Sequence, residues 1–135
     1  METLIRNAIM TPDGTVLESR HRHDYVTHVD AVNGQEYMVD GGLDYVRRTF
    51  IDENRPAQDL CVYLEDGHEK VREALTWGTY GKNGDQPLRQ VKLSEMSNAH
   101  IQACLDTVPR MYPQYRTAME TELEYRAEHY IVVED

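Results

Sequence analysis

The sequence predicts an α+β fold, in which an N-terminal antiparallel β-sheet made of hairpins is followed by C-terminal helices packed on it. Short runs rich in β-branched and aromatic residues, separated by Pro, Gly and Asn turn residues, fill the first half. Apolar residues at helical spacing are concentrated in the second half. Because no repeat or linker interrupts the 135 residues, we expect one domain over residues 1–135. Residues 1–93 are expected to be mainly sheet with one short helix, and residues 94–130 to form the C-terminal helices.

Two strong turn signals join the strands expected in the first half. Pro12-Asp13-Gly14 predicts a tight turn, because proline fixes φ and glycine accepts a positive φ. Asn33-Gly34 is typical of a two-residue hairpin turn in which both residues have positive φ. The expected strands cover residues 4–10, 15–19, 24–31, 35–39, 43–50 and 60–64.

A short helix over residues 67–76 is expected next. Asp66 and Glu69 have the spacing of a capping box, and apolar residues follow at helical intervals. A glycine-punctuated loop over residues 77–87 and a strand over residues 88–93 come after it.

The last two helices have recognisable boundaries. Ser94 or Ser97 is expected to cap the first of them, which ends before Pro109. Pro113 suits the first turn of the second helix, where a missing N–H has no cost. The expected apolar seam of that second helix is Tyr115, Met119 and Leu123. The glutamates expected to face solvent are Glu120, Glu122, Glu124 and Glu128.

The composition excludes several classes of protein. Lys and Arg number 14 against 24 Asp and Glu, and the net charge of −10 has the wrong sign for a coat on duplex DNA or RNA. A small anion held in one local basic pocket is compatible with this charge. The apolar runs are far shorter than the roughly 20 residues that cross a bilayer, and no secretory signal is recognisable. Cys61 and Cys104 are expected to be buried and unbridged in a reducing compartment.

The segment Ser19-Arg20-His21-Arg22-His23-Asp24-Tyr25 is the first candidate site. On a strand, its two histidines would share one face and its aspartate would lie on the other. With His28 close behind, the segment has ligands for a metal ion, although its two arginines disfavour a dication nearby. The other interpretations are histidines packed in the sheet, and an anion bound by Arg22 and His23.

A second candidate lies in the segment Asp40-Gly41-Gly42-Leu43-Asp44-Tyr45-Val46-Arg47-Arg48. The two glycines allow a sharp turn and a close approach of the backbone. Arg47 and Arg48 are neighbours, so on a strand one of them could face a pocket while the other faces away. Alternatively, Asp40 and Asp44 pair with the Arg20 and Arg22 segment and lock the sheet.

The loop Trp77-Gly78-Thr79-Tyr80-Gly81-Lys82-Asn83-Gly84-Asp85-Gln86-Pro87 is the third candidate. Trp77 and Tyr80 could stack on a nucleobase, amides could read its edge, and a lysine could meet a phosphate. The residues expected to contact a ligand here are Trp77, Tyr80, Lys82, Asn83 and Gln86. The loop lacks the spacing of a P-loop or a dinucleotide fingerprint. The alternative is a β-hairpin with a type I′ turn at Asn83-Gly84 and Trp77 in the core.

A fourth set, Arg110, Arg116, Glu124, Tyr125 and Arg126, lies in the C-terminal part of the chain. These side chains could project from an interface between helices toward a ligand, or simply form a solvated face. No nucleophile–base pair and no Gly-x-Ser-x-Gly elbow is present in the sequence. We therefore expect a binding protein and not an enzyme, with no cofactor.

Four motifs together resemble a family of small phage proteins. These are Arg22-His23-Asp24-Tyr25, the segment from Val39 to Arg48, the segment from Trp77 to Leu88, and Glu122-Leu123-Glu124-Tyr125-Arg126. They spread over nearly the whole chain. The chain is similar to the phage anti-Thoeris sponges, and among them to the type that was described first.

The resemblance implies that the protein acts against a bacterial defence in the host cytoplasm. Thoeris signals infection with a cyclic ADP-ribose isomer, and the sponge binds that signal without degrading it. Some members also bind cyclic trinucleotides, which implies possible action against CBASS-type immunity. The family combines an N-terminal antiparallel sheet with C-terminal helices and assembles as dimers that can form hexamers.

Two other functions fit the same residues. One is a metal-dependent phosphodiesterase that uses His21, His23 and Asp24 to destroy a nucleotide signal. The other is a phage protein that binds and blocks a host protein, which suits an acidic chain with nine tyrosines. A homo-oligomer, at least a dimer, is expected because so short a chain has too little helix to cover both faces of a sheet.

Overall fold

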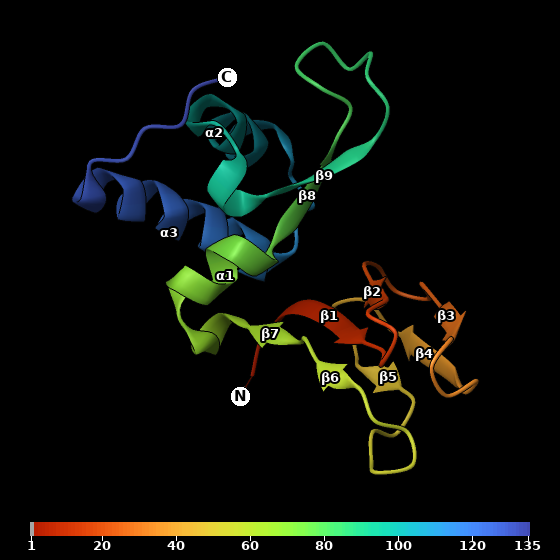
Figure 1. Cartoon of the computed structure of the whole chain (residues 1–135). Coiled ribbons are helices and arrows are strands. Elements are labelled where there is room, and N and C mark those ends of the chain that lie inside the picture. The colour runs from red at the N-terminus through yellow and green to blue at the C-terminus, as the bar shows by residue number, and fades with distance from the viewer. Residues whose placement is uncertain (1) are drawn as a thin grey trace. The chain divides into compact units, whose positions relative to one another are not determined.

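The computed structural model describes residues 2–135 and confirms the predicted α+β class (Figure 1). Antiparallel sheets fill the N-terminal half, and the last of the helices is C-terminal. The chain divides into two compact units, residues 2–63 and residues 64–135, here named the N-terminal and the C-terminal unit. The single domain predicted over residues 1–135 stays a prediction. No helix within residues 2–135 is long and apolar enough to cross a membrane.

The N-terminal unit is built around β1 (Leu4–Met10). This strand pairs with three others, β2 (Val16–Ser19), β6 (Gln58–Asp59) and β7 (Val62–Tyr63). A second sheet has the order β3 (Val26–Val29), β4 (Glu36–Asp40) and β5 (Arg47–Arg48). Side chains from both sheets share one core, whose buried members are Ile9, Leu17, Tyr37 and Val39.

One turn prediction and one strand prediction for this unit need correction. The loop between β3 and β4 is longer than the expected two residues, because the Asp30 carboxylate accepts hydrogen bonds from the backbone N–H groups of Val32 and Asn33. Gly34 has φ +69 there, whereas Asn33 does not have the positive φ that was expected. The strand expected over residues 43–50 is reduced to β5, because residues 41–45 form a turn in which Asp44 and Tyr45 donate to the carbonyl of Gly41.

The turn after β4 is anchored by two buried polar side chains. The Asn7 amide donates to the carbonyls of Asp40 and Gly42, at 3.0 Å each. Ser19 Oγ accepts from the N–H of Gly42 at 2.8 Å and donates to the carbonyl of Asp24 at 2.7 Å. The backbone N–H and C=O groups of this turn are therefore hydrogen-bonded although they are buried.

The C-terminal unit contains three α-helices and a hairpin. The elements are α1 (His68–Ala74), β8 (Thr76–Thr79), β9 (Arg89–Lys92), α2 (Asn98–Thr107) and α3 (Pro113–His129), with 3₁₀ turns η1 (Leu64–Asp66) and η2 (Leu93–Glu95). Ser97 caps α2 as predicted, since its side chain accepts from the N–H of His100. Pro113 begins α3 as predicted. The capping box at Asp66 is wrong, because Gly67 is the N-cap of α1 and no side chain caps it.

The loop expected over residues 77–87 is in fact a hairpin, the alternative interpretation of that segment. β8 pairs with β9 from Thr76 opposite Lys92 to Thr79 opposite Arg89. The type I′ turn is wrong, because positive φ occurs at Gly81 and Gly84 and not at Asn83. Residues 80–88 therefore form a long connecting loop, closed by a hydrogen bond from Gln86 N–H to the carbonyl of Tyr80.

Glu122 is fully buried, which corrects its predicted place on the solvent face of α3. Oε1 accepts from His68 Nε2 at 2.8 Å and from Arg72 Nε at 2.9 Å. Oε2 accepts from an Arg72 Nη at 2.8 Å and from Arg126 Nε at 2.7 Å. Burial raises the pKa of the Glu122 carboxyl, but hydrogen bonds from Arg72, Arg126 and His68 outweigh it, and the pKa is lowered overall. The carboxylate therefore stays charged inside the unit, with both oxygens satisfied.

We predict that Gly42→Ala destabilises the N-terminal unit much more than Gly14→Ala. Both glycines have positive φ, so each substitution carries the cost of a left-handed alanine, about 1–2 kcal/mol. A methyl group at Gly42 would also lie 2.3 Å from the backbone of His21, whereas one at Gly14 meets nothing within 4 Å. Urea unfolding of both variants measures the difference. Equal losses would contradict the packing around Gly42.

We predict that Glu122→Gln costs about 3–5 kcal/mol at pH 7, because it leaves the buried guanidinium of Arg126 and the half-buried one of Arg72 without their carboxylate. The matched control is Glu124→Gln, an exposed glutamate on the same helix, which should change stability little. The lowered pKa of Glu122 stabilises the fold fully above the unfolded value of 4.5 and less as pH falls through the folded value. The difference between parent and Glu122→Gln should therefore shrink below pH 4.5 in denaturant titrations. A difference independent of pH would contradict a charged Glu122.

Candidate ligand-binding site

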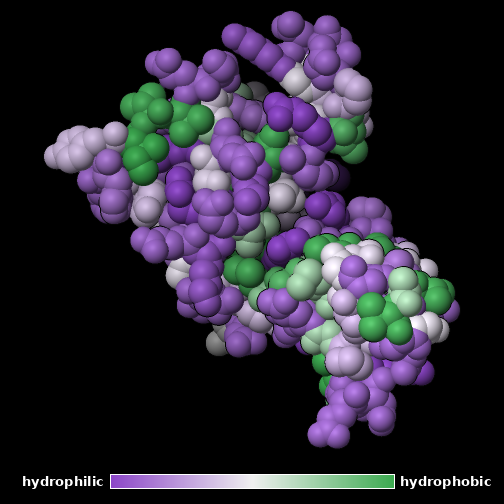
Figure 2. Space-filling model, viewed as in Figure 1, coloured by the Kyte–Doolittle hydropathy of each residue, from purple (hydrophilic) through white to green (hydrophobic). Residues whose placement is uncertain are grey.

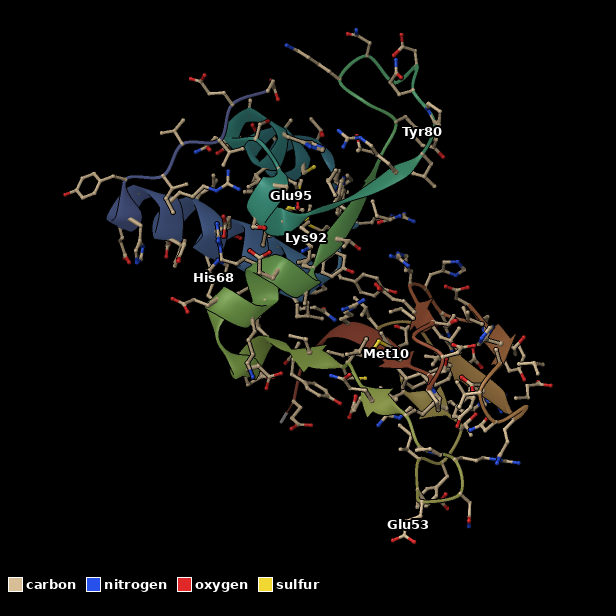
Figure 3. The ribbon with its side chains drawn as sticks, viewed as in Figure 1. Met10, Glu53, His68, Tyr80, Lys92 and Glu95 are labelled. Atoms are coloured by element: carbon tan, nitrogen blue, oxygen red, sulfur yellow. The ribbon has the colours of Figure 1, made fainter. Side chains whose placement is uncertain are left out.

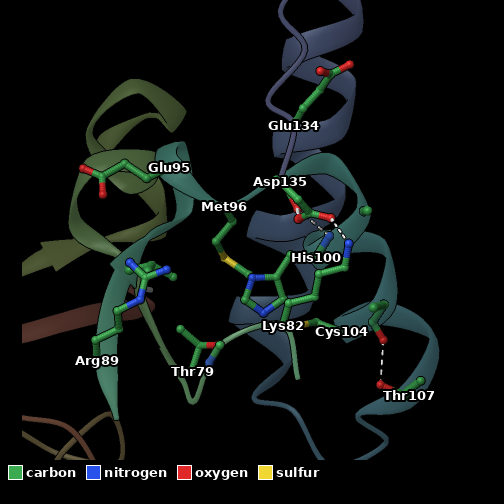
Figure 4. A pocket seen from close by; sticks show the side chains of 15 residues that line it. Thr79, Lys82, Arg89, Glu95, Met96, His100, Cys104, Thr107, Glu134 and Asp135 are labelled. Carbon is green, nitrogen blue, oxygen red and sulfur yellow. Dashed lines mark hydrogen bonds and ion pairs between the residues drawn. The ribbon is translucent and has the colours of Figure 1, made fainter. Parts of the chain in front are cut away.

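An open cavity of about 740 Å³ lies in the C-terminal unit, between the β8–β9 hairpin and α2 (Figure 4). Sites for small molecules are typically cavities of roughly 300–1,000 Å³. The hairpin contributes Thr79, Lys82 and Arg89, and the first turn of α2 contributes His100. The cavity is therefore of a size that can hold a nucleotide, and its walls come from the hairpin and its loop, from residues 95–97 and α2, and from residues 134 and 135.

The hairpin register explains why Thr79 and Arg89 meet at the cavity. They are the last cross-strand pair before the loop opens, so both lie at the same end of the hairpin. Lys82 follows in a turn closed by a hydrogen bond from Gly84 N–H to the carbonyl of Gly81. Tyr80, at the beginning of this loop, is marked in Figure 3 and is exposed.

The first turn of α2 forms another wall. Ser97 Oγ accepts from the N–H of His100 at 3.0 Å, which fixes both residues at the N-terminal end of the helix. Met96, which is buried, and Cys104 add an apolar surface to the cavity. Burial raises the pKa of the Cys104 thiol, so this sulfur stays protonated and serves as a small apolar group.

The charges in the cavity are mixed. Lys82, Arg89 and His100 are its basic side chains, and Glu95, Glu134 and Asp135 are its acidic ones. In Figure 4, Arg89 and Glu95 stand on one side and Lys82 and Asp135 on the other. Within residues 2–135 no hydrogen bond or ion pair engages the Arg89 side chain, which is exposed. Its five N–H donors are available to an incoming anion.

Of the residues predicted to bind a ligand, Lys82 lines this cavity. Asn83 and Gln86 lie on the same loop and are exposed. Trp77 lies on β8 and is half-buried, with its ring edge-on to Tyr115 at 6.3 Å between centroids. The loop prediction therefore located one wall of the cavity.

The C-terminal set is spread over separate environments. Arg116 donates to the carbonyls of Leu105 and Val108 and so satisfies the C-terminal end of α2. Arg126 is fully buried and bonded to Glu122, which leaves it no exposed surface for a ligand. Tyr125 stacks on His129 at 4.2 Å and lies under the Arg72 guanidinium. Arg110 is exposed in the connection between α2 and α3.

The other predicted ligand residues belong to the N-terminal unit. Arg22 and His23 are exposed in a turn, where His23 has φ +68. The expectation that His21 and His23 share a strand face is therefore wrong, because no strand forms at these positions.

Arg47 and Arg48 each have an internal partner. Arg47 lies 3.4 Å from the Asp40 carboxylate, so Asp40 pairs with Arg47 and not with the Arg20 and Arg22 segment. Arg48 makes two hydrogen bonds, of 3.0 and 3.1 Å, to Asp59. These bonds hold the pKa of Asp59 at about 2. Of the two arginines, Arg48 has the more buried side chain.

The histidines of this unit do not gather as a metal site would require. His21 Nε2 lies 4.0 Å from Asp24, while His28 Nε2 bonds Asp13 at 2.7 Å. Asp13, His28 and Asp30 are the described residues whose ligand atoms come together. Both Asp13 oxygens already accept hydrogen bonds, from side chains and from backbone N–H groups, and these keep its pKa far below the ordinary value. The cluster thus joins the β1–β2 turn to the end of β3 by hydrogen bonds.

Sequence reasoning missed Arg89 and His100. Each is a lone basic residue at the edge of a predicted element, and only the hairpin and the capped helix bring them to one cavity. Comparisons of the chain with family models, with curated proteins and with solved structures gave no match.

Proposed function

We propose that this protein is a sponge, which binds a cyclic ADP-ribose isomer in the cavity of the C-terminal unit and keeps it from a Thoeris-type effector. A cyclic trinucleotide is the second ligand class in this proposal. The observation that carries it is the cavity itself, which combines the unpaired guanidinium of Arg89 with Lys82 and His100 beside an aromatic, glycine-rich loop. The four family-like motifs support the same function.

The chemistry of such a ligand suits these side chains. A pyrophosphate bears two negative charges, and the planar fork of Arg89 could bind two of its oxygens at once. Lys82 would add a mobile point charge from the loop. A base could stack on Tyr80, whose ring is exposed at the start of the loop. Each role is a binding role, and none of them breaks a bond.

Sequestration depends on affinity and protein concentration, not on turnover. A shift from micromolar to nanomolar affinity needs roughly 4 kcal/mol, which charge-assisted hydrogen bonds in a partly desolvated cavity could supply. The net charge of −10 opposes an anionic ligand at long range. Salt screens that field beyond about 8 Å, so the side chains that line the cavity decide how it attracts an anion.

The homo-oligomer also remains a proposal. Exposed apolar side chains on the N-terminal unit include Val29, Val32 and Phe50, at 61%, 70% and 79% exposure. Figure 2 shows hydrophobic residues over β3 on a surface that is otherwise mostly hydrophilic. Where such side chains form a contiguous patch, the surface is typical of one that contacts another protein chain.

We predict that Arg89→Ala weakens binding of a cyclic ADP-ribose isomer at least tenfold and changes stability little, because Arg89 is exposed and has no internal partner to lose. Titration calorimetry with a panel of cyclic ADP-ribose isomers and cyclic oligonucleotides checks this. Lys70→Ala, an exposed cation on α1, is the charge-matched control and should bind like the parent. If Arg89→Ala binds as tightly as Lys70→Ala, the ligand is not in this cavity.

A further inference from the structure

The residues that follow α3 fold back onto α2. Tyr130 ends α3 in the left-handed conformation, with φ +57 and ψ +39, which an L-residue adopts only at a cost. The chain then reverses, and Ile131 N–H bonds the carbonyl of Arg126 at 2.8 Å. Residues 131–135, named the strap, run back toward the N-terminal end of α2 (Figure 1).

The strap is docked by specific hydrogen bonds. Asn98 N–H donates to the carbonyl of Val133 at 2.8 Å, and Asn98 Oδ1 accepts from the N–H of Val133 at 2.9 Å. Ser97 Oγ donates to the Asp135 carboxylate at 2.5 Å, and Lys82 Nζ lies 3.8 Å from the other oxygen of that carboxylate. Figure 4 shows the Lys82–Asp135 ion pair at the cavity. The strap therefore connects the hairpin loop to α2 across one side of the cavity.

The strap also sets the charge of the cavity. Two of its three acidic lining residues, Glu134 and Asp135, belong to the strap, and the third is Glu95. With the strap docked, acids outnumber Lys82 and Arg89. With the strap released, the two cations and His100 face Glu95 alone, so the same cavity becomes attractive to an anion.

We propose that the strap is a self-inhibitory gate, whose docked state pairs Lys82 with Asp135 and places two carboxylates in the cavity, and which an anionic ligand must displace. This inference rests on the proposed function only for the identity of the natural ligand. If only molecules with a released strap bind an anion, the apparent Kd equals the intrinsic Kd divided by the fraction of molecules whose strap is released. Weakening the strap should then tighten the binding of any small polyanion.

Two variants weaken the strap in different ways. Asp135→Ala removes the carboxylate that contacts Ser97 and Lys82. Val133→Pro removes the N–H that bonds Asn98 Oδ1 and leaves the net charge unchanged. Glu128→Ala, an exposed glutamate on α3, is the control that changes the net charge as Asp135→Ala does. Val133 and Asp135 follow the last helix, and Glu128 is exposed on it, so thermal melting should show a parent-like fold.

The test titrates parent and variants with inorganic pyrophosphate, followed by phosphorus NMR, and separately with the panel of cyclic ADP-ribose isomers. The gate predicts that Asp135→Ala and Val133→Pro both bind pyrophosphate roughly tenfold more tightly than the parent, while Glu128→Ala does not. Tightening by Asp135→Ala alone would mean simple charge repulsion and overturn the gate. Pyrophosphate affinity that is unchanged or undetectable in every variant would also overturn it.

The nucleotide titrations decide the proposed function independently. If pyrophosphate shows the gate but no cyclic ADP-ribose isomer binds any variant, the gate stands and the proposed function fails. If an isomer binds the parent while pyrophosphate shows no effect of the strap, the function stands and the gate fails.

Discussion

The C-terminal unit depends on the buried carboxylate of Glu122. It joins α1 to α3 through His68 and Arg72, and it fixes Arg126 within α3. A carboxylate buried without partners would cost several kcal/mol, but four short hydrogen bonds satisfy both oxygens here. The carboxylate is therefore well satisfied only when all of its partners are present, because Glu122 and Arg126 are buried where no solvent can replace a lost partner.

The candidate site follows from that constraint. Arg126, held by Glu122, donates to Asn98 Oδ1 and to the carbonyls of Leu93 and Ser94, which precede α2. These bonds set the position of the N-terminal end of α2, where His100 lines the cavity. Asn98 in turn receives the strap. A continuous series of hydrogen bonds thus connects the buried Glu122 with the strap beside the cavity.

The sequence predicts local structure well where one residue carries its own signal. Ser97 caps α2 and Pro113 begins α3 because each acts on its immediate neighbours. Glu122 was misplaced because apolar spacing alone assigns every glutamate of α3 to the solvent side. Its partner His68 lies 54 positions away in the sequence, and no local sequence pattern predicts that pairing.

The same distinction applies to the candidate site. Glycines and aromatic residues around Lys82 mark an unusual loop in the sequence, and Lys82 lines the cavity in the structure. Arg89 and His100 were missed because their meeting depends on the hairpin register and on the packing of α2. The arginines predicted to bind a ligand have different surroundings in the structure. Arg48 and Arg126 have bonded partners inside their units, and Arg110 is exposed.

The most direct test of the account is to recover the ligand after binding. A cyclic ADP-ribose isomer is incubated with excess protein, removed from solution as a complex, and released by heating the protein. The account predicts that all of the bound isomer returns chemically intact and able to activate a Thoeris effector. Release of linear or hydrolysed products would contradict sequestration and favour a hydrolase.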